Sequence, residues 1–527
     1  MAKVLILYPS TDSYGRFSIP MCNDSALLKS HGHEVSLFDT TFYETKDLYQ
    51  TSQTYSQNAT STELFQFQPC DLKPYGVRKE NVDVLQAFRD KVEQFDPDLI
   101  IFSFMGSQLT SIDQYEMYDR SIELIKKSQV NRESRLFLAG GYKPTLKLEE
   151  CVQDGVVDYF FQGECEPSFL EFADRFDRGE DLTTIDSLCY LKDGEIKINK
   201  LADPPDLNEL PFADFDIYED RMFVRPFHGN AVRGIDYELS RGCRFFCTFC
   251  MEESVKNLYK GDEDKYFRLK TIDRVIDEMK YLKERYSLDM VKFHDQDFLD
   301  IPEDYLDNLA ERWEKEVKLS FCVETTLVRI TKRKLKAMKK MNLLSMSIGL
   351  ESGNEHIRRN VMAKPTLSNE KIIALFEKIH ENRLDYHTYN LIGIPYETKE
   401  NIFETIRLNK RAKIRSASVN FYVPYEGTKL KELCLEKGWL KDDYENNYSL
   451  KESSALKMPQ ITDEELKHMM RYFHYSMNTP EFLWPIIGLF GKKDLLCRFL
   501  LVIFKRTLQV KLKIRAALGD LAKVHAI

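Results

Sequence analysis

Short apolar runs alternate with amphipathic segments over the first 180 residues of the chain. A run that is apolar throughout is typical of a strand buried on both faces, as in a parallel sheet covered by helices. Five such runs predict strands at 4–9, 33–38, 98–104, 135–141 and 157–163. The segments between them predict helices at 23–31, 82–95, 115–127 and from Glu166 onward. Residues 1–180 are therefore predicted to form a doubly wound, flavodoxin-like (Rossmann-type) domain.

The alternation stops and then resumes in a longer series. Residues 181–230 include LADPPDLNELPFADFD, whose prolines and acidic side chains are typical of a linker. Strands are then predicted at 237–240, 290–294, 319–323, 344–349, 387–392 and 417–422. Helices are predicted between them at 272–286, 303–314, 332–341, 369–381 and 399–412. Six βα units predict a partial (β/α)6 TIM-like barrel over 231–440, with a helical C-terminal region over 441–527.

Composition limits the class of protein. A chain of 527 residues exceeds what one core usually supports, so two or three domains are expected. The net charge of −9 gives no reason to expect a nucleic-acid partner. The apolar run in MAKVLILYPS is too short for a signal peptide, and eight of the eleven cysteines are scattered singly rather than arranged as a disulfide framework. We therefore expect a cytoplasmic protein.

The other three cysteines are the strongest chemical signal. Cys243, Cys247 and Cys250 follow a predicted strand with the spacing CxxxCxxC. Thiolates are the usual ligands of iron–sulfur clusters, and a cubane held by three of them leaves one iron free to bind a small molecule. Gly242 would let the backbone turn tightly before the loop. The alternatives are a buried apolar cluster and a structural zinc knuckle, although zinc usually takes four ligands and no second cysteine pair follows.

This spacing at the end of the first barrel strand, with Phe249 before the last cysteine, resembles the radical S-adenosylmethionine superfamily. The resemblance implies a 4Fe–4S cluster on the three cysteines, whose free iron is chelated by the methionine nitrogen and carboxylate of S-adenosylmethionine. It implies that reduction then yields methionine and a 5′-deoxyadenosyl radical, and that Phe249 lies against the adenine. Arg244 departs from the proline often found after the first cysteine.

Four later segments resemble the family's motifs at successive strand ends. FHDQDF (293–298) is similar to F-x-D-D-x-F, with Gln296 at the second acidic place. IGLESGN (348–354) is similar to G-x-E-S-G-S. NLIGIPYET (390–398) is similar to G-x-P-G-E-T, with Tyr396 replacing the second glycine. PYEGT (424–428) is similar to P-x-P-G-T.

These motifs supply candidate cofactor contacts. Glu324 and Glu351 suit hydrogen bonds to ribose hydroxyls or to the methionine ammonium, the alternative being surface salt bridges. Asp295 is either a cofactor contact or a helix N-cap. Further candidates are Ser352, Gly393 and Pro395. The last two are alternatively simple strand-end punctuation, although a glycine there would let the backbone approach an adenine edge.

A flavodoxin-like domain before such a barrel resembles the cobalamin-binding domain of one large subfamily. GECEP (163–167) resembles that subfamily's G-E-G-E, and glycine-rich strand ends suit nucleotide-like ligands. The resemblance implies cobalamin contacts at Ser103, Gly140, Gly141, Gly163 and Glu164, with the segment up to Ser107 lining the same crevice. The Asp-x-His-x-x-Gly motif that supplies a histidine to cobalt elsewhere is absent. The alternative is a relic domain or one that binds another ligand.

The last residues show a different pattern. Residues 491–515 hold eight Lys or Arg and one acidic residue among apolar ones, which is typical of an interfacial helix on an anionic membrane. A helix pair that caps the barrel fits equally well. Charges interrupt the apolar stretch 482–504, so we expect no transmembrane helix. The first interpretation favours peripheral membrane contact and a lipid-like substrate.

Taken together, the resemblance implies a cobalamin-dependent enzyme that methylates an unactivated carbon of a small-molecule or lipid-like substrate. A reductant such as flavodoxin or ferredoxin would supply the electron. The alternatives are a radical cyclase, oxidase or rearrangement enzyme of secondary or tetrapyrrole metabolism. Less favoured are an iron–sulfur electron carrier and a tRNA methylthiotransferase, whose second cysteine-rich domain is not matched by Cys22, Cys70, Cys151 and Cys165.

Overall fold

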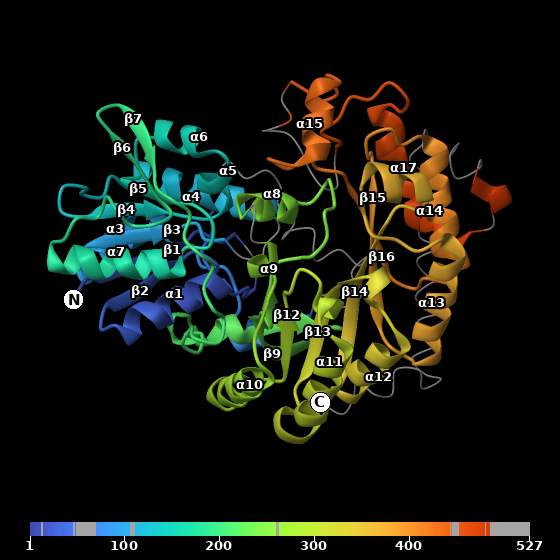
Figure 1. Cartoon of the computed structure of the whole chain (residues 1–527), viewed down its shortest axis with the longest axis horizontal. Helices are drawn as coiled ribbons and strands as arrows, with labels where there is room; N and C mark the ends of the chain where they lie inside the picture. Colours follow the sequence, from blue (N-terminus) through green and yellow to red (C-terminus); the bar gives the residue numbers. More distant parts are fainter. Residues whose placement is uncertain are drawn as a thin grey trace.

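The computed structural model contains two seven-stranded sheets that lie side by side (Figure 1). It describes residues 1–11, 14–45, 48, 70–105, 111–259, 263–442, 444, 453–479 and 481–484. The first sheet belongs to the N-terminal part of the chain, and the second is the partial barrel that follows. The predicted fold class, a flavodoxin-like domain followed by a partial (β/α)6 barrel, is confirmed.

The first sheet has the strand order β2-β1-β3-β4-β5-β6-β7. Its first five strands are parallel and comprise β1 (Lys3–Tyr8), β2 (Glu34–Asp39), β3 (Leu99–Phe102), β4 (Leu136–Ala139) and β5 (Tyr159–Phe161). The order 2-1-3-4-5 is that of flavodoxin-like sheets, with the switch point between β1 and β3. Helices α1 (Ile19–Ser30) and α7 (Glu166–Arg178) contribute to the core on one face. Helices α3 (Val84–Phe95), α4 (Ser111–Ser128) and α6 (Leu148–Gln153) flank the other.

The segment predicted as a linker contains three strands. β6 (Leu188–Lys192) and β7 (Glu195–Ile198) form an antiparallel hairpin on the edge of the first sheet. β8 (Val224–Phe227) pairs antiparallel with the first barrel strand. The missed signal is Asp193-Gly194, which turns the hairpin with φ of 53° and 79°. Asp-Gly between short apolar segments is a strong two-residue hairpin signal.

The second sheet has the order β16-β15-β14-β13-β12-β9-β8. Its parallel strands are β9 (Asn230–Tyr237), β12 (Met290–Phe293), β13 (Ser320–Thr326), β14 (Leu343–Glu351), β15 (Tyr386–Ile392) and β16 (Ala417–Phe421). The helices between them are α10 (Ile272–Tyr286), α11 (Glu303–Arg312), α12 (Lys332–Lys340), α13 (Asn369–Glu381) and α14 (Lys399–Arg411). The first barrel strand therefore begins earlier than predicted, and 237–240 covers only its end.

Several short elements after β9 were not predicted, and they position the cysteines. They are β10 (Ser240–Arg241), α8 (Met251–Leu258), α9 (Glu263–Tyr266) and β11 (Arg268–Leu269). β10 and β11 form a two-stranded antiparallel ribbon. In Figure 1, α8 lies between the N-terminal sheet and the barrel, next to α5 (Tyr142–Leu146).

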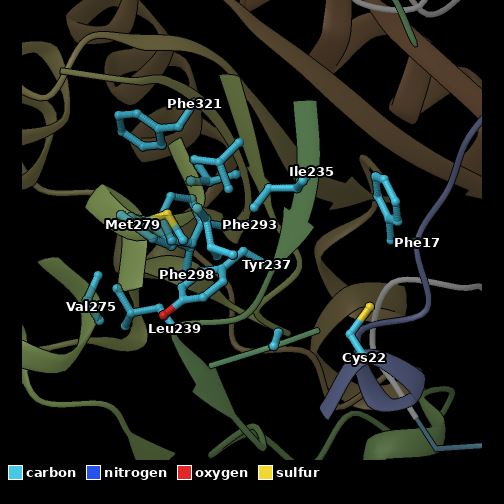
Figure 2. Close-up of a cluster of buried hydrophobic side chains, with 14 of the residues drawn as sticks. Phe17, Cys22, Ile235, Tyr237, Leu239, Val275, Met279, Phe293, Phe298 and Phe321 are labelled. Atoms are coloured by element: carbon cyan, nitrogen blue, oxygen red, sulfur yellow. The ribbon is translucent and has the colours of Figure 1, made fainter. Parts of the chain in front are cut away.

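One hydrophobic core joins the two sheets. It includes Phe17 and Cys22 from the N-terminal part together with Ile235 and Phe293 from the barrel. Figure 2 shows these side chains in one cluster. A continuous core of this kind fixes how the two sheets sit against each other.

Helix α15 (Lys429–Glu436) follows the last barrel strand, and the described part of the C-terminal region contains α17 (Asp463–Asn478). α17 packs on α14 and β16. No helix among the described residues is long and apolar enough to cross a membrane. The basic and apolar segment 491–515 lies outside the described residues, so its membrane interpretation stays a prediction.

Candidate functional site

The three cysteines lie on one loop between β10 and α8. Thr248 anchors the middle of this loop to the barrel, because its hydroxyl donates to the Val361 carbonyl at 2.7 Å and its carbonyl accepts from the Leu430 N–H at 2.9 Å. The Cys250 N–H donates to the Cys247 carbonyl at 3.0 Å, and Cys250 is the residue before α8. The loop is thus held at defined points rather than by its own contacts alone.

Gly242 begins the loop in a conformation that needs glycine. Its φ is +89°, and a Cβ there would lie 2.3 Å from the Tyr266 carbonyl oxygen. Both the left-handed backbone and the close approach exclude a side chain. The tight turn expected from the sequence is present.

The thiols lie in partly buried positions that disfavour ionisation. Burial raises the pKa of Cys243 to about 12 and raises the pKa values of Cys247 and Cys250 above the usual thiol value. Bound metal would reverse this, since thiolate is the form that coordinates. Among the described residues, no three Cys, His, Asp or Glu side chains converge as ligands of one ion. A cubane does not require such convergence, because each cysteine binds a different iron.

Asp295 is hydrogen-bonded to the backbone that leads into the cysteine loop. Its carboxylate accepts from the Leu239 N–H at 3.3 Å and from the Ser240 N–H at 2.6 Å. It also accepts from the Ser240 hydroxyl at 2.5 Å. The residue before the next helical turn is Asp297, so Asp295 is not an N-cap. Asp295 fixes the backbone from β9 into β10 and thereby positions the cysteine loop.

Glu351 ends β14 close to the cysteine loop. Its φ is 66°, which is rare for a residue with a side chain and is held by a β-bulge at this strand end. Its carboxylate forms a buried ion pair with Lys364 at 3.2 Å. Lys364 also lies 5.8 Å from the centre of the Phe249 ring. Burial raises the pKa of the Cys247 thiol, which Lys364 lowers and Glu351 raises, so this pair acts on the cysteine loop.

The other predicted barrel residues differ in accessibility. Glu324 is paired with Lys292 at 3.4 Å on the inner face of the barrel. Ser352 is fully buried, and its hydroxyl accepts from the Asn354 N–H at 3.3 Å, a local structural contact. Glu324 therefore remains open to a ligand, whereas Ser352 supports the loop.

The Gly393–Pro395 turn is held by a carboxyl that the sequence analysis did not single out. Glu397 accepts from the N–H groups of Gly393 and Ile394 at 2.7 and 3.3 Å. Gly393 has a φ of +75°. Burial raises the pKa of Glu397 to about 8. The turn is thus fixed by a buried acid, and Pro395 is buried beside it.

The predicted N-terminal residues come together at the carboxyl ends of β3, β4 and β5. The Gly140 N–H donates to the Ser103 carbonyl at 3.0 Å, and a Cβ on Gly141 would lie 3.1 Å from the Ser103 hydroxyl. The Gly163 N–H donates to the Thr145 hydroxyl at 3.1 Å. Ser107 lies outside the described residues. These turns form the edge at which open α/β sheets bind ligands.

Glu164 faces the barrel through an ion-pair network. It pairs with Arg241 at 2.9 Å and also contacts Arg268. Glu166 pairs with Arg241 at 2.6 Å. Arg241 and Arg268 face each other across the β10–β11 ribbon. The second half of the glycine-rich turn therefore fastens the N-terminal domain to the base of the cysteine loop, a contact that sequence alone gave no sign of.

Residues 237–408 match the model of the Radical SAM superfamily. An uncharacterized methyltransferase of Pyrococcus horikoshii is 24% identical over 73% of this chain and 79% of its own length. The bacteriochlorophyllide d C-12(1)-methyltransferase of Chlorobaculum tepidum is 22% identical over 70% of this chain and 75% of its own. The methyltransferase TsrM of Kitasatospora setae, solved with cobalamin and a [4Fe-4S] cluster, superposes with a TM-score of 0.62 at 14% identity, over 83% of this chain and 78% of that one.

The matched segment contains the cysteine loop and most of the barrel. This segment of the chain is therefore similar to the Radical SAM superfamily. The fold of the whole chain is similar to that of TsrM.

Proposed function

We propose that this chain is a cobalamin-dependent radical S-adenosylmethionine methyltransferase acting on an unactivated carbon of a small molecule. One observation carries the proposal. The glycine turns of the flavodoxin-like sheet and the three-cysteine loop of the barrel meet at a single junction, through the contacts of Glu164 and Glu166 with Arg241. A methyl carrier bound at those turns would therefore lie beside the radical source.

The residues at the loop fit a cluster and its ligand. Cys243, Cys247 and Cys250 would hold a 4Fe–4S cluster, which supplies the electron that cleaves S-adenosylmethionine. Lys364 and Glu351 place a buried cation and anion next to Cys247, matching the carboxylate and ammonium of a methionine moiety. Phe249 packs against the apolar cluster that includes Ile394, which suits a stacked base.

The turns of the first sheet fit cobalamin held without a histidine from the chain. The residues that follow β3 and β4 have small side chains or none, namely Ser103, Gly140 and Gly141. Between Pro9 and Pro20 the chain has no histidine. Cobalt would therefore lack an imidazole ligand from this segment.

The inner face of the barrel favours a polar substrate. Asp236, Lys292 and Glu324 carry ionic groups there, and the His294 imidazole lies against Asp236. Buried charges attract polar groups and disfavour an alkyl chain. A small polar molecule is thus preferred to a lipid, and binding of full-length protein to anionic liposomes would reopen the lipid-like alternative through residues 491–515. The electron donor is proposed to be a flavodoxin or ferredoxin in the cytoplasm.

Anaerobic reconstitution tests the function directly. The protein should carry about four irons per chain, as a cubane requires. It should also show the visible absorbance of cobalamin. With S-adenosylmethionine labelled by deuterium in its methyl group, mass spectrometry of incubated cell extract should reveal a product three mass units heavier than with unlabelled cofactor. Zinc in place of iron, or the absence of any labelled product, would contradict the proposal.

A further inference from the structure

The cysteine loop is tied to the N-terminal domain at its far end as well as at its base. Glu252 lies two residues after Cys250, and the Tyr142 hydroxyl donates to its Oε1 at 3.2 Å. Tyr142 directly follows Gly140 and Gly141, the turn assigned above to cobalamin. One hydrogen bond therefore joins the cobalamin turn to the start of the helix that ends the cysteine loop.

Two further donors hold the same carboxylate. The Tyr266 hydroxyl donates to Oε2 at 2.6 Å, and the Gln296 amide donates to Oε1 at 3.4 Å. Tyr266 precedes β11 and Gln296 follows β12, so Glu252 connects three segments in addition to its own. A carboxylate with three donors has its position defined from several directions.

The contact is shielded from water by apolar side chains. Tyr142 and Tyr266 belong to a buried cluster with Met251, Val255 and Tyr259. Tyr142 is 5% exposed and Tyr266 is 3% exposed. Hydrogen bonds in such surroundings are stronger than exposed ones, and removing one partner leaves the other unsatisfied.

The base of the loop is fixed in a matching way. Arg241 pairs with Glu164 and Glu166 of the β5–α7 turn and with Glu238 of the barrel at 2.7 Å. Arg241 precedes Cys243 by two residues, and Glu252 follows Cys250 by two. Each end of the cysteine loop is thus fastened to a different glycine turn of the first domain.

We propose that Glu252 and Tyr142 are positioning residues that set the distance between the cobalt and the iron–sulfur cluster. The inference rests on the proposed function, because it requires both groups. The pair contacts the turn that would hold one cofactor and the helix next to a ligand of the other. Transfer between two centres is sensitive to small displacements, and a misplacement of about 1 Å can cost a factor of about 100 in rate.

The test uses the holoenzyme with both centres paramagnetic, the reduced cluster and Co(II) cobalamin. Pulsed dipolar electron paramagnetic resonance reports the distance between them and its spread. Tyr142→Phe keeps the ring in its apolar cluster and removes only the donor. We expect a broadened or shifted distance distribution in Tyr142→Phe and Glu252→Ala, with iron and cobalamin contents unchanged.

Matched variants separate positioning from a general loss of packing. Tyr118→Phe removes another buried tyrosine hydroxyl of the same domain, one that donates to the Cys151 carbonyl at 3.3 Å and not to Glu252. It should keep the wild-type distribution. Glu252→Gln keeps an oxygen that can accept from Tyr142 and should restore a narrow distribution. The double variant Tyr142→Phe/Glu252→Ala should be no worse than Glu252→Ala alone, because both remove the same contact.

The outcomes distinguish this inference from the proposed function. If wild-type protein binds no cobalamin, the proposed function fails and the spacing argument fails with it. If both centres load and the distribution in Tyr142→Phe and Glu252→Ala equals that of wild type, only the positioning inference is overturned. An equal broadening in Tyr118→Phe would also overturn it, since the effect would then come from loss of any buried hydroxyl.

Discussion

The two sheets are built from the same βα repeat but differ in what their faces carry. In the first sheet, β1 sends Val4 and Ile6 to one apolar core and Leu5 and Leu7 to another, so both faces are closed by helices. In the barrel, the outer face is equally apolar, as Figure 2 shows for Ile235, Tyr237, Phe293 and Phe321.

The inner face of the barrel is polar instead. Asp236 accepts from Arg225 and contacts His294 at 2.8 Å, and Lys292 pairs with Glu324 on the neighbouring strands. Closed TIM barrels usually fill this space with branched apolar side chains. This difference in polarity indicates where each domain can hold a ligand. The first sheet has only its strand ends available, whereas the barrel has its interior as well.

The largest expected effect follows from removing the cysteines of the barrel. The triple variant Cys243→Ala, Cys247→Ala, Cys250→Ala should lose all cluster iron and all 5′-deoxyadenosine formation, because no thiolate remains on the loop. Cobalamin should still bind, since the first sheet is untouched. Iron analysis and visible spectra check both halves, and simultaneous loss of cobalamin would mean that the two sites are not separable.

Glu351→Ala tests the contribution of one buried ion pair of the barrel to cofactor cleavage. The change leaves Lys364 buried without its partner at 3.2 Å, and breaking a buried pair in this way costs about 3–5 kcal/mol. We expect cleavage of S-adenosylmethionine to fall by about 100-fold, a fold-change equivalent to roughly 2.7 kcal/mol. Product analysis gives the rate. An unchanged rate would remove Glu351 from the cofactor site.

Two alanine substitutions compare how strongly side chains on the helix-covered face of the first sheet and on the inner face of the barrel stabilise the protein without ligands. Phe102→Ala in β3 removes a fully buried ring and should destabilise the protein by about 3–5 kcal/mol. Ser418→Ala in β16 removes a buried hydroxyl with no hydrogen-bond partner among the described residues, and should be nearly neutral. Denaturant midpoints measure both. A large loss in Ser418→Ala would show that the inner face is packed rather than open.

A pH dependence of stability is also expected from the barrel. Burial raises the pKa of Glu397 to about 8, above its usual value near 4.5. The stability that this group contributes is therefore fully present below about pH 4.5 and is lost as pH rises through 8. Glu397→Gln should flatten the decline in melting temperature between pH 6 and pH 9. An identical slope in both proteins would contradict the assignment.

The sequence predicted the repeating part of the fold well for a physical reason. Apolar runs and helical periods report local burial, so strands such as β14 and helices such as α10 and α13 lie close to where they were expected. The ribbon of β10 and β11 has only two residues in each strand, which is too short to show an alternation of apolar and polar residues.

The sequence predicted the site only where its functional residues lie close together in the chain at a characteristic spacing. The three cysteines share one loop, whereas the Lys364 partner of Glu351 and the Tyr142 partner of Glu252 come from distant segments. Their motif positions suggested ligand contacts for Asp295 and Glu164, which stay predictions, but gave no sign of their protein partners, the Ser240 backbone and Arg241. Pairing across the fold has no signature in a single sequence.

The proposed function requires that the barrel hold a cluster with one iron open to S-adenosylmethionine. Electron paramagnetic resonance of the reduced cluster, recorded with and without S-adenosylmethionine, tests it most directly. We expect a signal that changes shape on addition of the cofactor, because the cofactor would bind the iron that Cys243, Cys247 and Cys250 leave free. A full complement of iron with a spectrum unmoved by saturating S-adenosylmethionine would contradict it.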